Sequence, residues 1–107
     1  MVAQVVNHPI LKRFRAALAE LYGDRIERIV LYGSRARGDA HPESDYDVAI
    51  FLRDFSDRWP EMDRIIPIVT DILYEDQAFI HVMPYAAGAY RERTPLMGEI
   101  RLEGLDL

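Results

Sequence analysis

The stretch LYGSRARGDAHPESDYDVAIFL, residues 31–52, carries most of the information in this sequence. One apolar run ends in a polar turn with two glycines, and the acids of Asp45-Tyr46-Asp47 then lead directly into a second apolar run. An unpaired carboxylate is costly where a strand enters a core, so two acids at that point need a cation nearby. The stretch therefore predicts two strands joined by a turn, with a cation bound beside the turn.

The composition describes one globular domain, residues 1–107, because the chain is too short for two. Half of the residues are hydrophobic and 29% are charged, which disfavours disorder. The absence of cysteine excludes disulfides and thiolate-ligated zinc. No apolar run is long enough to cross a bilayer, and the first residues lack the order of a secretory signal. We expect a cytoplasmic protein without membrane contact.

The charge balance argues against direct binding to nucleic acid. The formal net charge is -5, and a single Lys stands among the 13 basic residues. Nonspecific binding to nucleic acid depends on neutralising phosphates with Lys and Arg. We therefore expect no direct binding to nucleic acid.

Hydrophobic periodicity predicts the order helix, strand, strand, helix, strand, helix. The first helix is capped by Asn7, has Pro9 in its first turn and ends at Gly23. The strands are expected at residues 25–32, 45–52 and 78–85, with a helix at 59–74 and a loop at 86–93. A last helix is framed by Thr94 as its cap, Pro95 in its first turn and Gly104 past its end. This order predicts an α/β (α+β) fold, with a small mixed β-sheet of three or more strands flanked by helices.

The helix at 59–74 carries a broad apolar face. Pro67 lies within it and would remove a backbone donor, so the helix is expected to be kinked or split there. The residues expected to face the core are Trp59, Met62, Ile65, Ile66, Val69, Ile72 and Leu73.

Asp45 and Asp47 form the candidate metal site. Strand side chains alternate, so both acids are expected on one face, about 6.6 to 7 Å apart along the strand. Two carboxylates without a His or Cys cluster indicate a hard cation, and Mg²⁺ takes one or two carboxylates and completes its shell with water and phosphate oxygens. The acids therefore predict a phosphate ligand nearby.

The turn before the acids offers what a phosphate needs. Gly33 lets the backbone approach a ligand, and Ser34 supplies a hydroxyl. Arg35 and Arg37 are candidate triphosphate contacts, although solvated loop charges or partners for the acids of the same turn are equally plausible roles. A nucleoside triphosphate bound at the turn, with metal bridging its oxygens, would explain both the Gly-Ser turn and the pair of acids.

Gly33-Ser34, ten intervening residues and then Asp45-Tyr46-Asp47 resemble the signature of the polymerase-beta-type nucleotidyltransferases, especially the minimal (MNT-type) members. The resemblance implies the nucleotidyltransferase fold, with Asp45 and Asp47 holding Mg²⁺ and Gly33 and Ser34 holding ATP or another nucleoside triphosphate. It implies transfer of AMP to a hydroxyl with release of pyrophosphate. Members of this size are commonly paired with a HEPN-type ribonuclease toxin, so the implied acceptor is a tyrosine of such a toxin and the implied role is antitoxin.

The sequence departs from the family pattern at the third carboxylate, which catalytic members usually present from a later strand. His81 stands at that place in the strand expected at 78–85. His81 could serve as a base or a ligand, or it could be an ordinary strand residue. Asp71, Glu75 and Asp76 precede the strand and are the alternative source of the acid.

Two other functions remain open. The protein could be a catalytically weak or inactive nucleotide-binding antitoxin subunit that acts by binding its partner, which the missing third acid favours. It could also be a transferase that acts on a small molecule such as an antibiotic or a sugar. The last helix bears on partners, because Leu96, Met97, Ile100 and Leu102 offer more apolar surface than a short helix must hide. Core packing is one explanation, and a docking or oligomer surface is the other.

Overall fold

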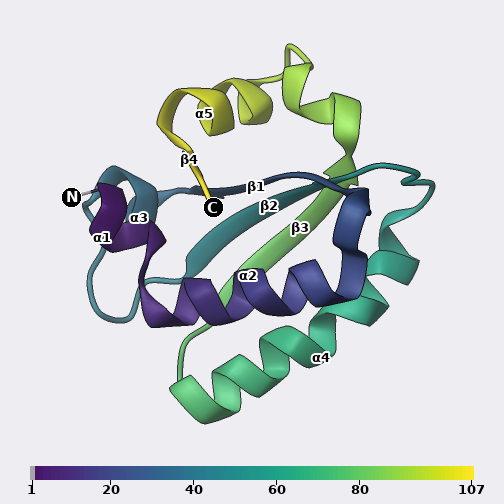
Figure 1. Cartoon of the computed structure of the whole chain (residues 1–107). Coiled ribbons are helices and arrows are strands. Elements are labelled where there is room, and N and C mark those ends of the chain that lie inside the picture. Colours follow the sequence, from purple (N-terminus) through teal and green to yellow (C-terminus); the bar gives the residue numbers. More distant parts are fainter. Residues whose placement is uncertain (1) are drawn as a thin grey trace.

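The computed structural model describes residues 2–107 as a four-stranded sheet with helices on both faces (Figure 1). The helices are α1 (Val2–Val6), α2 (Pro9–Tyr22), α3 (Ser34–Arg37), α4 (Arg58–Asp76) and α5 (Pro95–Glu103), with 3-10 turns η1 (Gly23–Arg25) and η2 (Ala87–Arg91). The strands are β1 (Ile26–Tyr32), β2 (Tyr46–Leu52), β3 (Ile80–Ala86) and β4 (Leu105–Asp106), in the order β3-β2-β1-β4. Only the β2–β3 pair is parallel within the described chain, so the predicted mixed α/β sheet is confirmed.

The alternation along β2 divides the core into two layers. Val48 and Ile50 belong to the larger cluster with α2 and α4, whereas Ala49 and Phe51 belong to the smaller cluster with α5. Figure 1 shows α2 and α4 on one side of the sheet and α5 on the other. Asp47 has the parity of Ala49, so it lies on the α5 face. Within residues 2–107, none of the helices has the length and apolar character that crossing a membrane requires.

Helix α2 begins one residue later than its predicted cap implies. His8 is the capping residue, and its Nδ1 accepts a hydrogen bond from the amide of Ile10 at 3.2 Å. The prediction of Asn7 as cap is wrong because the first helical residue is Pro9, which places His8 at the capping position. Gly23 ends the helix with a φ of 53°, as its position in the sequence predicts.

Helix α4 runs without a break from Arg58 to Asp76, so the predicted split at Pro67 does not occur. Pro67 is exposed, and the carbonyl four residues earlier belongs to another exposed residue, Asp63. Water can therefore satisfy that carbonyl in place of the missing amide. The predicted core face is partly wrong, since three of its seven apolar side chains are exposed: Trp59, Ile66 and Leu73.

The C-terminal part covers the second face of the sheet. Thr94 caps α5, because its Oγ1 accepts from the amide of Met97 at 3.2 Å. Met97 and Ile100 are buried against the sheet, whereas Leu102 is 90% exposed. Core packing therefore explains part of the apolar helix, and oligomerisation through it stays a prediction. The sequence analysis missed α1, the turn η2 and the short strand β4.

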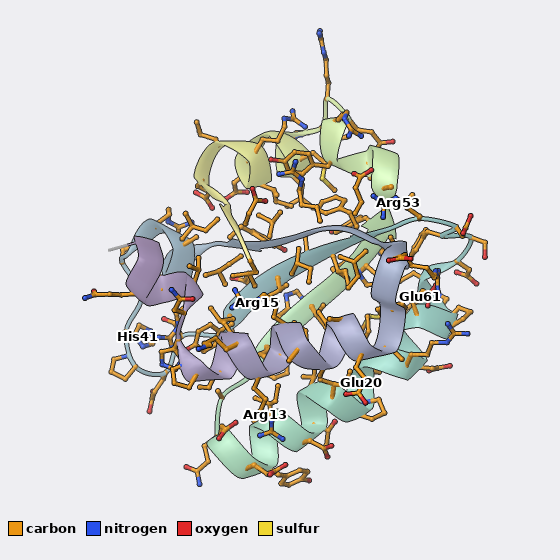
Figure 2. The ribbon with its side chains drawn as sticks, in the orientation of Figure 1. Arg13, Arg15, Glu20, His41, Arg53 and Glu61 are labelled. Atoms are coloured by element: carbon orange, nitrogen blue, oxygen red, sulfur yellow. The ribbon has the colours of Figure 1, made fainter. Side chains whose placement is uncertain are left out.

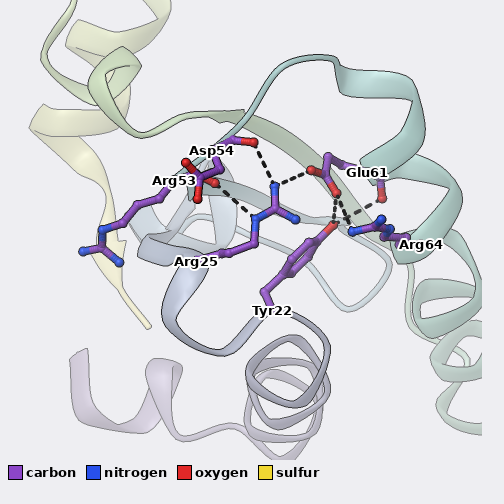
Figure 3. Close-up of polar contacts among 6 residues, drawn as sticks. All are labelled: Tyr22, Arg25, Arg53, Asp54, Glu61 and Arg64. Atoms are coloured by element: carbon purple, nitrogen blue, oxygen red, sulfur yellow. Dashed lines mark hydrogen bonds and ion pairs between the residues drawn. The ribbon is translucent and has the colours of Figure 1, made fainter.

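A polar cluster, defined by Tyr22, Arg25 and Glu61, joins three segments at the end of β2 where α4 begins (Figure 3). Glu61 is 6% exposed; one carboxylate oxygen lies 2.6 Å from Nη2 of Arg25, and the other accepts from the Tyr22 hydroxyl at 3.2 Å. Burial, and then the charge of Glu61, raise the pKa of Tyr22 to about 12. The cluster compensates a buried charge and fixes the start of α4.

Candidate active site

Gly33 links β1 to α3 and contacts the acid of β2. Its φ is 75°, a conformation that residues with a side chain rarely adopt. A Cβ added at this position would collide with Oδ2 of Asp47. The Gly33 carbonyl accepts from the amides of Ala36 at 3.1 Å and Arg37 at 3.0 Å, which closes the first turn of α3. The structure therefore brings Gly33 and Asp47, two of the predicted site residues, into direct contact.

Tyr32, Asp47 and His81 form a row across three strands on the α5 face. The register pairs Asp47 with Tyr32 of β1 and with His81 of β3. Nδ1 of His81 lies 3.4 Å from Oδ1 of Asp47, and about half of the His81 side chain is exposed. His81 therefore lies where the sequence analysis looks for a third carboxylate. Asp45 directly precedes β2 and is exposed.

Tyr32, at the β1 end of this row, remains protonated at neutral pH. Burial, and then the charges of Tyr85, Asp47 and Glu99, raise its pKa to about 12. The hydroxyl of Tyr32 can therefore donate a hydrogen bond at the site, but it is a poor base there.

The acids before β3 do not supply the missing carboxylate. Glu75 and Asp76 pair with Arg13 of α2 at 2.7 Å and 2.8 Å, and Figure 2 shows Arg13 between α2 and α4. Asp71 lies on α4, which covers the face of the sheet opposite Asp47. In the described chain, His81 is therefore the β3 residue that adjoins Asp47.

Arg35 and Arg37 take different positions, although both follow the Gly-Ser turn. Arg35 donates to the carbonyl of Ser44 at 2.7 Å and to that of Pro42 at 3.2 Å, and its guanidinium lies 4.3 Å from the ring centroid of Tyr46. Tyr46 is on the face opposite Asp47, so Arg35 holds the loop before β2 rather than pointing toward the acids. A nucleotide contact of Arg35 stays a prediction that this geometry does not favour.

Arg37 belongs to the α5 side of the turn. Its Nε donates to Asp39 at 3.2 Å and its Nη1 donates to Glu103 at 3.1 Å. These contacts, the hydrogen bond to Asp39 foremost, raise the pKa of Arg37 above its ordinary value. Arg37 therefore stays charged beside the Gly-Ser turn, as a phosphate ligand must.

Glu103 is a site residue that the sequence analysis missed. Its Oε1 accepts from the amide of Gly33 at 3.2 Å as well as from Arg37, and its side chain is only 18% exposed. Glu103 is the last residue of α5, 70 positions from Gly33 in the chain. No local pattern could have placed it, because its position depends on how α5 folds back over the sheet.

Comparisons with known proteins agree with this geometry. A model of the nucleotidyltransferase domain family matches residues 11–94. Two curated relatives come from Methanocaldococcus jannaschii, and their names give protein adenylyltransferase as the expected activity. MJ0141 is 36% identical over 61 residues, and MJ0604 is 50% identical over 40 residues. The matched stretches cover 57% and 37% of this chain and 61% and 40% of the relatives' lengths. The chain thus covers less than two thirds of either relative.

A solved structure carries the same fold. It is described as the crystal structure of a toxin-antitoxin with AMP-PNP, and it matches with a TM-score of 0.60 at 16% identity. The match covers 87% of this chain and 68% of that chain. The resemblance to the minimal nucleotidyltransferases is thus confirmed, and because the family model covers most of the chain, the protein belongs to the nucleotidyltransferase domain family.

Proposed function

We propose that this protein is a Mg²⁺-dependent nucleotidyltransferase that moves AMP from ATP to a hydroxyl, and that the acceptor is a tyrosine of a partner HEPN-type toxin. The observation that carries the proposal is the contact between Gly33 and Asp47. It joins a turn suited to phosphate and an acid suited to metal at one end of the sheet. In this role the protein is an antitoxin, and a cytoplasmic location is part of the proposal.

The acids at this end fit a divalent cation. Asp47 offers carboxylate oxygens, the donors that Mg²⁺ prefers, and the one side-chain contact recorded for it within residues 2–107 is with His81. Neither Asp45 nor Asp47 forms an ion pair with an Arg or Lys of the described chain. Mg²⁺ bound here would neutralise phosphate charge and polarise the phosphate oxygens.

The rest of the chain would orient the reactants. Gly33, Ser34 and Arg37 lie on the β1 side of Asp47 and would hold the triphosphate, whereas His81 lies on the β3 side, where the acceptor would approach. The acceptor oxygen forms a bond to the α-phosphorus as the bond to the β-phosphate oxygen breaks. Pyrophosphate then leaves, and the proton of the acceptor hydroxyl is lost to solvent or a base.

The similar proteins support the choice of substrates. The names of the two Methanocaldococcus jannaschii relatives favour a protein acceptor and an adenylyl donor. The solved structure of a toxin-antitoxin with AMP-PNP favours an ATP-like nucleotide and a toxin as partner.

Labelled ATP tests the reaction class. The protein is incubated with Mg²⁺ and a partner protein that co-purifies with it, once with ATP labelled at the α-phosphate and once with ATP labelled at the γ-phosphate. Nucleotidyl transfer labels the partner from the α-position alone, whereas label from the γ-position would indicate phosphoryl transfer and reject the proposal. A double variant, Asp45→Ala with Asp47→Ala, is the matched control and should transfer no label.

His81 favours a second candidate function. An imidazole is not a preferred ligand of Mg²⁺, so a site with His81 in place of a third carboxylate could bind nucleotide without turning it over. The protein would then silence its partner by binding alone. An Asp47→Asn variant separates the two functions: a pure binder still neutralises the partner, whereas an enzyme with this change does not.

A further inference from the structure

Glu103 places a carboxylate against the Gly-Ser turn. Its Oε1 accepts from the Gly33 amide at 3.2 Å and from Nη1 of Arg37 at 3.1 Å. These donors are the kind that a phosphate oxygen uses, a glycine amide and a guanidinium. A single carboxylate oxygen thus holds two donors of the turn at once.

The segment that delivers Glu103 is fixed to β1. Glu103 precedes Gly104, and a Cβ at Gly104 would collide with the Ile100 carbonyl and with Val30 of β1. The chain then pairs with β1 as β4, and the amide of Leu107 donates to the carbonyl of Ile29 at 2.9 Å. The backbone that carries Glu103 is therefore held against β1 by contacts other than the ion pair.

We propose that Glu103 is an internal anion that occupies the phosphate donors of Gly33 and Arg37 until a nucleotide displaces it. This inference rests on the proposed function, because it assigns the same donors to the triphosphate. It makes Glu103 a positioning residue that acts on nucleotide affinity through Gly33 and Arg37. It is not a catalytic residue, because it acts through these two donors and is not proposed to contact the reacting atoms.

Competition between the two anions has a measurable consequence. The triphosphate must break both contacts of Glu103 and then lie near a displaced carboxylate, so Glu103 weakens nucleotide binding. Because linkage is reciprocal, a bound nucleotide also loosens the hold of α5 on the turn. The contact between the last turn of α5 and the Gly-Ser turn would therefore depend on whether nucleotide is bound.

Replacement of Glu103 by Gln tests the inference. The amide oxygen of Gln can keep the shape and a neutral hydrogen bond, but it gives up the charge assistance, which is about half of the strength of such a bond. We expect calorimetry to show that the Glu103→Gln variant binds α,β-methylene ATP, which cannot transfer AMP, about five- to tenfold more tightly than wild type at saturating Mg²⁺. A purely structural residue would not give tighter binding when replaced.

Glu92→Gln is the matched control, because it removes the same charge from the exposed segment just before α5, and its side chain forms no hydrogen bond with Gly33 or Arg37. Its affinity should stay within twofold of wild type. If Glu103→Gln does not fold, as judged by its thermal melt, Glu103→Asp keeps the charge but shortens its reach, and it too should bind more tightly. Unchanged or weaker binding would overturn the inference, whereas failure of wild type to bind nucleotide would overturn the proposed function itself.

Discussion

The carboxylates at the two ends of β2 have opposite surroundings. At the end where α4 begins, Glu61 is buried and contacts Arg25 and Tyr22. At the other end, Asp47 is partly exposed, and the side chain that pairs with its carboxylate is His81. Figure 1 shows these two ends of β2 at opposite ends of the sheet, one toward α3 and the other toward the start of α4. A compensated carboxylate stabilises the fold, whereas an uncompensated one is available for a cation and a substrate.

The largest expected effect is the loss of transfer in an Asp47→Asn variant. The change removes the charge that would attract the metal but keeps the shape of the side chain, so the rate of AMP transfer should fall about 100-fold or more. The rate of label incorporation from α-labelled ATP measures this effect. Thermal melting should show little change in stability, since Asp47 forms no ion pair with an Arg or Lys of the described chain and its contact with His81 is partly exposed.

Next in size is the cost of replacing Glu61 by Gln. The buried carboxylate would lose its charge and its ion pair with the partly exposed Arg25, so the free energy of unfolding should fall by about 2 kcal/mol. Urea unfolding measures this change, with Asp63→Asn, an exposed acid of the same helix, expected to stay within about 0.5 kcal/mol of wild type. Transfer activity per folded molecule should be unchanged, and a large loss of activity would contradict the division between the two ends.

Gly33→Ala should lower both the stability of the fold and the affinity for nucleotide. The new Cβ would meet the Asp47 carboxylate, and the positive φ would strain the backbone, so we expect a loss of about 1 to 2 kcal/mol in stability together with weaker nucleotide binding. Gly98→Ala is the matched control, because Gly98 is helical and has open space around its Cβ position. Denaturant unfolding and calorimetry with Mg²⁺ and ATP measure the two effects. Normal nucleotide affinity in Gly33→Ala would refute a tight fit at this turn.

The smallest predicted effect is a pH dependence of stability from Tyr22. Its folded-state pKa of about 12 exceeds the ordinary value of 10, so between these values the unfolded chain loses a proton that the folded chain keeps. Stability from this group is complete below pH 10 and is lost as the pH rises toward 12. Wild type should lose about 1 kcal/mol more than Tyr22→Phe between pH 9 and pH 11 in urea unfolding. If the free energy of unfolding fell equally with pH in wild type and Tyr22→Phe, the raised pKa of Tyr22 would not contribute to stability.

Local patterns were enough to predict the elements that form the site. Gly33 and Asp47 flank a turn between apolar runs, and the structure places that turn and its two strands where the sequence indicates. His81 also falls at the expected place on β3, because alternation along a strand is a local property. The family signature then implied a metal-binding role for Asp47 and a triphosphate-binding role for Gly33.

Long-range contacts explain the errors. The burial of Glu61 was not predicted, because the residues that compensate its charge, Arg25 and Tyr22, are distant in the chain. Trp59 and Ile66 were assigned to the core because the apolar stripe of α4 is wider than the face the sheet covers. Glu103 could not be connected with the Gly-Ser turn, since tertiary packing alone brings the two together.

The intact mass of the partner protein tests the central claim most directly. The co-purified partner is incubated with ATP, Mg²⁺ and either wild type, Asp47→Asn or Glu61→Gln, and its mass is then measured. We predict that the partner gains one or more AMP units with wild type and with folded Glu61→Gln, and none with Asp47→Asn. An equal gain with Asp47→Asn, or no gain with wild type that binds both ATP and the partner, would contradict the assignment of catalysis to this end of the sheet.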